Sequence, residues 1–252
     1  MTITRLIAIG LIFACTCAAW VVLGTALKVR TERSNYELGT AVAGNWGQEM
    51  VQLQPRVYYP SPTDDSGFRD IGPRGSDIAI DLFYEPKRKG LFRHRAWRGV
   101  FDATWTVENP TPIRQTIYFE FPFPAENTPF TDFKLLVNGA ESDQRSPEGG
   151  KITEALVLEA GESAPVQVEF QTRGLNQWRY HFDEGRASSG RRVRDFQLVM
   201  NTDFADIDFP SGVGSPPEED RHLGDDGKGW GLEWRYPDVI DAPAIGMAMP
   251  KI

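Results

Sequence analysis

The stretch Phe101-Asp102-Ala103-Thr104-Trp105-Thr106-Val107 alternates apolar and polar side chains without interruption. Successive side chains of a strand point to opposite faces of a sheet, so the four odd-numbered residues share one face and the polar ones share the other. This pattern is typical of a strand with one buried and one solvated face. A core position therefore explains Trp105 without a ligand.

The same alternation recurs along most of the chain. Residues 116–121 (TIYFEF) and 166–171 (VQVEFQ) repeat it, and turn signals such as Asn109-Pro110 and Asn138-Gly139 separate the runs. About ten strands with no helix between them predict a mainly β fold, an antiparallel β-sandwich. The expected strands cover residues 51–59, 77–84, 99–108, 114–121, 133–137, 152–158, 165–171, 178–182, 193–202 and 229–236.

A long apolar segment precedes these strands. Residues 6–27 (LIAIGLIFACTCAAWVVLGTAL) contain no charge, and about 20 apolar helical residues suffice to cross a bilayer. A cleaved signal ending at Cys17-Ala18-Ala19 and a lipoprotein signal at Ile12-Phe13-Ala14-Cys15 are alternatives, but the apolar run continues beyond both. The sequence therefore predicts one long N-terminal transmembrane helix in contact with membrane lipid.

With this segment as an anchor, the chain is expected to divide into three parts. Residues 1–33 are expected to form a transmembrane anchor with a short cytoplasmic N-terminus, and residues 34–48 a membrane-proximal helix. Residues 49–252 are expected to form the extracytoplasmic β-sandwich domain. That length is sufficient to bury a core.

Charge bears on the location of this domain and on its partners. Arg5 precedes the apolar segment while Lys28, Arg30 and Arg33 follow it, which by the positive-inside rule favours a cytoplasmic domain. Long domains translocate largely regardless of charge, and residues 34–252 carry a net charge of −11. We expect a single-span protein of the bacterial inner membrane with a periplasmic domain. The acidic balance argues against nucleic acid as a partner.

Two patches of sequence resemble a known family. Residues 31–36 (TERSNY), 46–49 (WGQE) and 53–60 (LQPRVYYP) are similar to the membrane-proximal segment of CreD-type inner-membrane proteins, although Gln54 stands where that family has glycine. The later stretches resemble the late periplasmic strands of the same family, and comprise residues 174–185, 196–198, 203–204, 210–219 and 229–234.

The resemblance implies a function without established catalytic activity. Members of the family combine an N-terminal anchor, a periplasmic β domain and further transmembrane helices, and they are linked to envelope stress and integrity. We therefore expect a non-enzymatic interaction or scaffold module that needs no cofactor. Since no second apolar span occurs before Ile252, the chain is expected to be either a shortened relative or a piece of a longer membrane protein. The end MAMPKI lacks the polar fraying usual at a natural terminus and favours the piece. The expected partner is a membrane protein or further transmembrane helices.

The alternative is a glycan-binding or glycan-cleaving β-sandwich. Aromatic rings stack on sugars, and two nearby carboxylates can hydrolyse a glycosidic bond. Packing in the core is the plainer explanation for such rings in a β domain. The rings in question belong to Trp97, Trp105, Trp178, Tyr180, Trp230 and Trp234.

Metal binding and nucleophilic catalysis have weaker support. Nine potential oxygen or nitrogen ligands fall within residues 203–226, but the EF-hand spacing is absent and residues 218–226 also fit a solvated loop. The three histidines His94, His181 and His222 lack zinc-site spacing, and Ser188-Ser189-Gly190 is not a nucleophile elbow. The nine are Asp203, Asp206, Asp208, Glu218, Glu219, Asp220, His222, Asp225 and Asp226.

Two basic clusters stand out in this acidic chain. Such clusters can contact an anionic partner or lipid headgroups, although a solvated hairpin tip is the plainer interpretation. The candidate contact residues are Lys87, Arg88, Lys89, Arg93 and Arg95, with His94 and Arg98 nearby. The second cluster comprises Arg186, Arg191, Arg192 and Arg194.

Overall fold

The computed structural model divides the chain into two compact units, residues 1–45 and Trp46–Ile252. It describes Ile3 and residues 12–13, 15–28, 49–64, 66–89, 92–124, 129–144, 147–182, 192–224 and 227–251. The expected helix over residues 34–48 lies outside these residues, as do Arg186, Arg191, Ser188-Ser189-Gly190, Asp225 and Asp226.

The expected transmembrane helix over residues 6–27 is wrong. In the described part of the chain no helix combines the length and the apolarity needed to cross a membrane. The continuous helical run that the structure describes covers residues 15–28. The fold class with a leading transmembrane helix, and the single-span inner-membrane location derived from it, are corrected accordingly.

The second unit is mainly β, as the alternation indicates. Short strands at sheet edges, which have too few residues to alternate visibly, raise the number above the expected ten. The strands are β1 (Met50–Leu53), β2 (Arg56–Pro60), β3 (Phe68–Asp70), β4 (Gly75–Tyr84), β5 (Lys87–Lys89), β6 (Phe92–His94), β7 (Ala96–Glu108), β8 (Gln115–Pro122), β9 (Thr131–Val137), β10 (Ala140–Glu141), β11 (Lys151–Leu158), β12 (Ser163–Leu175), β13 (Gln177–His181), β14 (Arg192–Thr202), β15 (Val213–Gly214), β16 (Arg221–Leu223), β17 (Trp230–Ile240) and β18 (Ala244–Ala248), with one 3₁₀ turn, η1 (Glu218–Asp220).

These strands form a large sheet and three smaller ones. The large sheet has the order β10-β9-β12-β7-β4-β14-β17-β16, the β13 sheet the order β1-β13-β18-β15, and the β8 sheet the order β11-β8-β2-β3. Strands β5 and β6 form a separate hairpin. Most pairs are antiparallel, but β1 with β13, β4 with β14, and β15 with β18 are parallel. The expectation of a purely antiparallel fold is therefore wrong, because alternation reports which face is buried and not which strands become neighbours.

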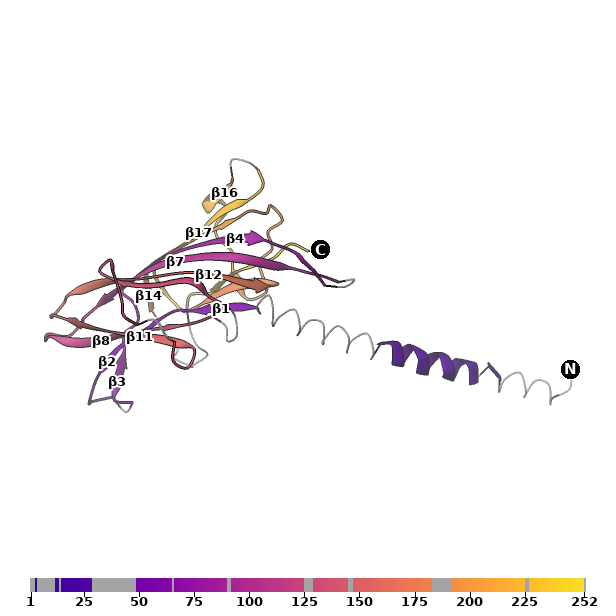
Figure 1. Ribbon diagram of the computed structural model, residues 1–252, viewed down its shortest axis with the longest axis horizontal. Coiled ribbons are helices and arrows are strands. Elements are labelled where there is room, and N and C mark those ends of the chain that lie inside the picture. The colour runs from indigo at the N-terminus through magenta and orange to yellow at the C-terminus, as the bar shows by residue number, and fades with distance from the viewer. Residues whose placement is uncertain are drawn as a thin grey trace. The chain divides into compact units, whose positions relative to one another are not determined.

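One face of the large sheet packs on both four-stranded sheets. Trp105 of β7 contacts Phe119 and Phe121 of β8, each with ring centroids 5.7 Å apart. Phe196 of β14 contacts Phe182, which follows β13, at 4.8 Å. Figure 1 shows β4, β7 and β12 together in one layer and β2, β8 and β11 in the other. The core lies between these layers, and Trp105 is fully buried in it as the alternation predicts.

Strands β1 and β2 belong to one nearly continuous run that changes sheet. Met50 of β1 pairs with Trp178 of β13, whereas Val57 of β2 pairs with Phe119 of β8. The residues between them, Gln54 and Pro55, are buried, and the backbone N–H of Gln54 donates to the carbonyl of His181 at 2.8 Å. This run therefore joins the two smaller sheets into one layer.

Candidate functional site

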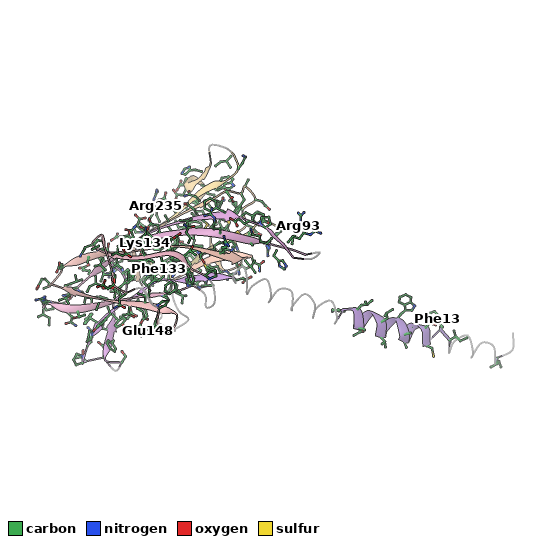
Figure 2. The ribbon with its side chains drawn as sticks, viewed as in Figure 1. Phe13, Arg93, Phe133, Lys134, Glu148 and Arg235 are labelled. Carbon is green, nitrogen blue, oxygen red and sulfur yellow. The ribbon has the colours of Figure 1, made fainter. Side chains whose placement is uncertain are left out.

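The predicted basic segment forms a hairpin that continues the paired strands β4 and β7 of the large sheet. Strands β4 and β7 pair as far as Tyr84 and Trp97, and the N–H of Glu85 then donates to the carbonyl of Ala96 at 2.9 Å. The chain continues directly into β5 and β6. Figure 2 shows Arg93 near the end of this hairpin, beyond the body of the large sheet.

A hollow of about 440 Å³ lies where this hairpin meets two other segments, and we call it the basic hollow. Two backbone hydrogen bonds of 2.8 Å connect the segments: Asn176 N–H donates to Arg95 O, and Met249 N–H donates to Asn176 O. Asn176 adopts a left-handed φ of 62°, a conformation that asparagine tolerates better than most residues. The hollow is lined by Arg93, His94, Arg95, Asn176 and Lys251.

Positive charge dominates this hollow. Arg93, Arg95 and Lys251 contribute three formal charges, and Lys251 is 3.4 Å from the carboxylate of Asp208. Arg95 donates from Nη1 to the carbonyl of Met249 at 3.3 Å, which fixes one edge of its guanidinium. Since a guanidinium has five N–H donors, others remain for a bound anion.

Two further side chains, those of His94 and Tyr84, lie at or beside the hollow. Nε2 of His94 is buried and has no hydrogen-bond partner among the described residues. Burial raises the pKa of the Tyr84 phenol, while the charges of Arg95 and Arg93 act in the opposite direction. Tyr84 also donates to the carbonyl of Pro250 at 3.4 Å. The hollow is therefore bordered by a neutral phenol as well as by the three cations.

The structure divides the five residues expected to contact a partner. Arg93 and Arg95 meet in the hollow, whereas Lys87 lies 3.3 Å from Glu85 and Arg88 is opposite Arg93 in the β5–β6 hairpin. Lys89 ends β5, and its side chain lies outside the described part of the structure. The neighbouring Arg98 also pairs with Glu85, at 3.3 Å, and its guanidinium lies 4.0 Å from the Phe83 ring centroid.

Sequence reasoning missed Asn176 and Lys251 as members of this site. Both are far from Arg93 along the chain, and neither belongs to a basic run. Asn176 separates two expected strands, which is the position of a turn residue. No sequence signal places it beside Arg95.

The described members of the second basic cluster, Arg192 and Arg194, lie among carboxylates. Arg192 and Arg194 line a cleft of about 690 Å³ together with Arg74, which pairs with Asp195 at 2.9 Å and with Glu108 at 3.3 Å. Arg192 pairs with Asp238, and this hydrogen bond holds the pKa of the Asp238 carboxyl below its usual value. Because three carboxylates face three guanidiniums, this cleft is a weaker anion site than the basic hollow.

The expected metal ligands are dispersed. Asp203 accepts the N–H of Tyr84 at 2.7 Å, Asp208 pairs with Lys251, and Asp220 lies 3.5 Å from Arg235. In the part of the chain that the structure describes, no group of three or more His, Cys, Asp or Glu side chains could hold a metal ion.

The aromatic rings considered for sugar stacking are mostly in the core. Five of the six residues are at most 1% exposed, namely Trp97, Trp105, Trp178, Tyr180 and Trp234. The sixth, Trp230, is partly buried and donates from Nε1 to the carbonyl of Ala205 at 3.0 Å. The five buried rings have no face available to a sugar.

Comparison with known proteins assigns no family to the chain. No protein-family model matches it, and no curated protein matches it. One similar solved structure is a "putative nutrient binding protein" from Legionella pneumophila, with 12% identity and a TM-score of 0.41 over 79% of this chain and 71% of the other. A TM-score below 0.5 is too low to establish a common fold, so this likeness transfers neither fold nor function.

Proposed function

We propose that the β domain is a non-catalytic interaction module that binds an acidic segment of a partner protein in the basic hollow. The observation that supports this most directly is that Arg93 and Arg95 of one hairpin meet Lys251, which comes from a distant part of the chain. Two backbone hydrogen bonds, from Asn176 N–H to Arg95 and from Met249 N–H to Asn176, hold the three segments around the hollow together in the unbound protein. Such preorganisation lowers the entropic cost of binding.

The charge distribution supports an acidic occupant. The chain has a net charge of −8, so a local concentration of cations contrasts with the rest of its surface. Arginine presents planar N–H pairs that match a carboxylate in two parallel hydrogen bonds. Complementary charge also accelerates encounter and excludes partners of the wrong sign.

The resemblance to CreD-type proteins suggests the setting of this binding. It implies an interaction or scaffold role in envelope integrity, and we propose that role for the domain. Its support is the similarity of residues 31–36, 46–49 and 53–60 to that family, together with a hollow suited to binding.

Titration of the full-length protein with poly-L-glutamate tests the proposal. By calorimetry we expect saturable binding at 50 mM salt that weakens strongly at 300 mM, because screening reduces contacts between exposed charges. The double variant Arg93→Ala/Lys251→Ala is expected to bind at least about tenfold more weakly, since two charge-assisted contacts are lost. Lys134→Ala removes an exposed cation of β9, away from Arg93 in Figure 2, and serves as the control.

Two results would contradict the proposal. One is wild-type protein that does not bind poly-L-glutamate at 50 mM salt. The other is a loss of affinity in Lys134→Ala equal to that of the double variant, which would indicate non-specific attraction to any surface cation.

A further inference from the structure

Three aromatic rings lie on the side of the β8 sheet that faces away from the core. Along β2 and β8 the inward residues Val57, Ile117 and Phe119 are fully buried, so the alternate residues Tyr58 and Tyr118 point outward. These two tyrosines are directly opposite each other in the β2–β8 ladder. Neither belongs to the core cluster or packs against it.

The rings form one contiguous group, which we call the outer aromatic face. Tyr58 and Tyr118 are stacked with centroids 5.4 Å apart and an interplanar angle of 17°. Phe68 of β3 meets Tyr58 edge to face at 5.4 Å and is 47% exposed. Phe68 is exposed, whereas Tyr58 and Tyr118 are partly buried. An exposed apolar ring set among aromatic neighbours is a candidate contact surface.

A row of charged side chains crosses the same face two residues further along the strands. Lys151 of β11, Glu120 of β8, Arg56 of β2 and Asp70 of β3 follow the order of the strands in the sheet. Their successive separations are 2.8, 3.7 and 3.0 Å. At about 3.4 Å per residue, this row lies roughly 7 Å from the tyrosine pair.

The row is electrically balanced, which indicates the chemistry of the occupant. Two cations and two carboxylates neutralise each other, so the face offers no net attraction to an ion. Burial, and then the negative charge of Glu120, raise the pKa of Tyr58, so this phenol remains a neutral donor and acceptor at physiological pH.

We propose that the outer aromatic face binds a neutral polysaccharide. The C–H face of a sugar ring packs on an aromatic ring, while its hydroxyls both donate and accept hydrogen bonds. Phe68 and Tyr118 supply the first kind of contact, whereas the ring of Tyr58 is stacked on Tyr118 and carries the Arg56 guanidinium at 5.0 Å from its centroid. The phenols, Arg56 and Glu120 supply the second kind. A glycan is a neutral ligand with both properties, whereas an acidic protein segment would gain nothing from a balanced row.

This surface is independent of the basic hollow. Strands β2, β3 and β8 lie at the end of the β domain opposite the C-terminus, whose residue Lys251 lines the hollow (Figure 1). One module could therefore hold a glycan at one end and an acidic protein segment at the other. Failure of one binding event leaves the other unaffected.

Binding of the full-length protein to cellulose, chitin and amylose tests this inference. We expect wild-type protein to bind at least one of these neutral glycans in a sedimentation assay, with little dependence on salt. Phe68→Ala and Tyr118→Ala are each expected to weaken that binding about tenfold, the order expected for losing one apolar ring contact. Tyr118→Phe keeps the ring and is expected to retain most of the affinity.

The controls separate this site from the hollow and from misfolding. Ile113→Ala removes another exposed apolar side chain, 61% exposed, and Arg93→Ala alters the hollow; both are expected to bind glycan as wild type does. Circular dichroism confirms that each variant is folded. The inference is overturned if wild-type protein binds none of the three glycans, or if the folded Phe68→Ala and Tyr118→Ala variants bind as well as wild type.

Discussion

The indole ring of Trp97 occupies the space that a side chain at Gly174 would need. A Cβ placed on Gly174 would stand 2.3 Å from Cζ2 of Trp97, far inside van der Waals contact. The two residues are directly opposite each other in the β7–β12 ladder, and Trp97 is 1% exposed. The absence of a side chain on one strand therefore makes room for the largest side chain on the next.

We expect Gly174→Ala to destabilise the protein by about 1–3 kcal/mol, since the indole must leave its position in a close-packed core. Chemical denaturation measures the change. Gly75→Ala is the matched control, because its Cβ would meet no atom closer than 3.6 Å. Equal stabilities of the two variants would contradict the packing explanation.

Asn109 is a second position at which one side chain carries several contacts. It is fully buried, and its Nδ2 donates to the carbonyls of Ile113, Leu158 and Glu159 at 2.8, 3.0 and 3.0 Å. Asn109→Ala leaves these carbonyls without that donor, so we expect a loss of about 2–3 kcal/mol in the free energy of unfolding. Thr111→Val, which removes only one hydroxyl partner of Asn109, is expected to cost less, and the opposite order would contradict this account.

Asn176 links the backbone geometry to the basic hollow. Its φ of 62° is unfavourable for alanine but not for glycine. We expect Asn176→Ala to lower the unfolding free energy by about 1 kcal/mol and to weaken poly-L-glutamate binding, because Arg95 and Met249 are both held by the Asn176 backbone. Asn176→Gly is expected to restore the binding. If glycine and alanine behave alike, backbone conformation is not the cause.

Because the pKa of His181 is lowered in the folded protein, we expect the stability of the protein to depend on pH. Burial, and then the charge of Arg179, lower the pKa of His181 in the folded protein below the value of about 6.5 in the unfolded chain. The unfolded chain thus binds more protons near pH 6, so the contribution of His181 is fully present above pH 6.5 and is lost as pH falls below it. Unfolding free energies at pH 8 and pH 5 measure this. His181→Gln is expected to reduce the difference, and an unchanged difference would contradict the assignment.

The sequence predicts burial better than it predicts neighbours. Alternation correctly places Trp105 and Phe119 on inward faces, because side-chain direction is a local property of a strand. It does not reveal that β4 lies parallel to β14, since that pairing joins residues as distant as Asp81 and Asn201, 120 positions apart. The same limit applies to the basic hollow, where Arg93 is conspicuous in the sequence but Lys251 is not.

Length alone was misleading at the N-terminus. An uncharged run over residues 6–27 satisfies the composition of a membrane span, yet in the described part of the chain no helix is both long and apolar enough to cross a membrane. The outer aromatic face, by contrast, is a feature that the sequence does not indicate at all. Tyr58 and Tyr118 belong to ordinary alternating runs, and only the layer order of the sheets reveals which side of each strand remains open.

The run formed by β1 and β2 has a consequence for how the protein is made. Met50 pairs with Trp178, so β1 leaves the ribosome long before its partner in β13 has been synthesised. At about 5–20 residues per second, the delay is on the order of ten seconds. Throughout that interval the first strands of the nascent chain expose unpaired edges, which invites pairing with other chains. Translation speed and chaperone access at this stage should therefore influence the yield of folded protein more strongly than the stability of the finished domain does.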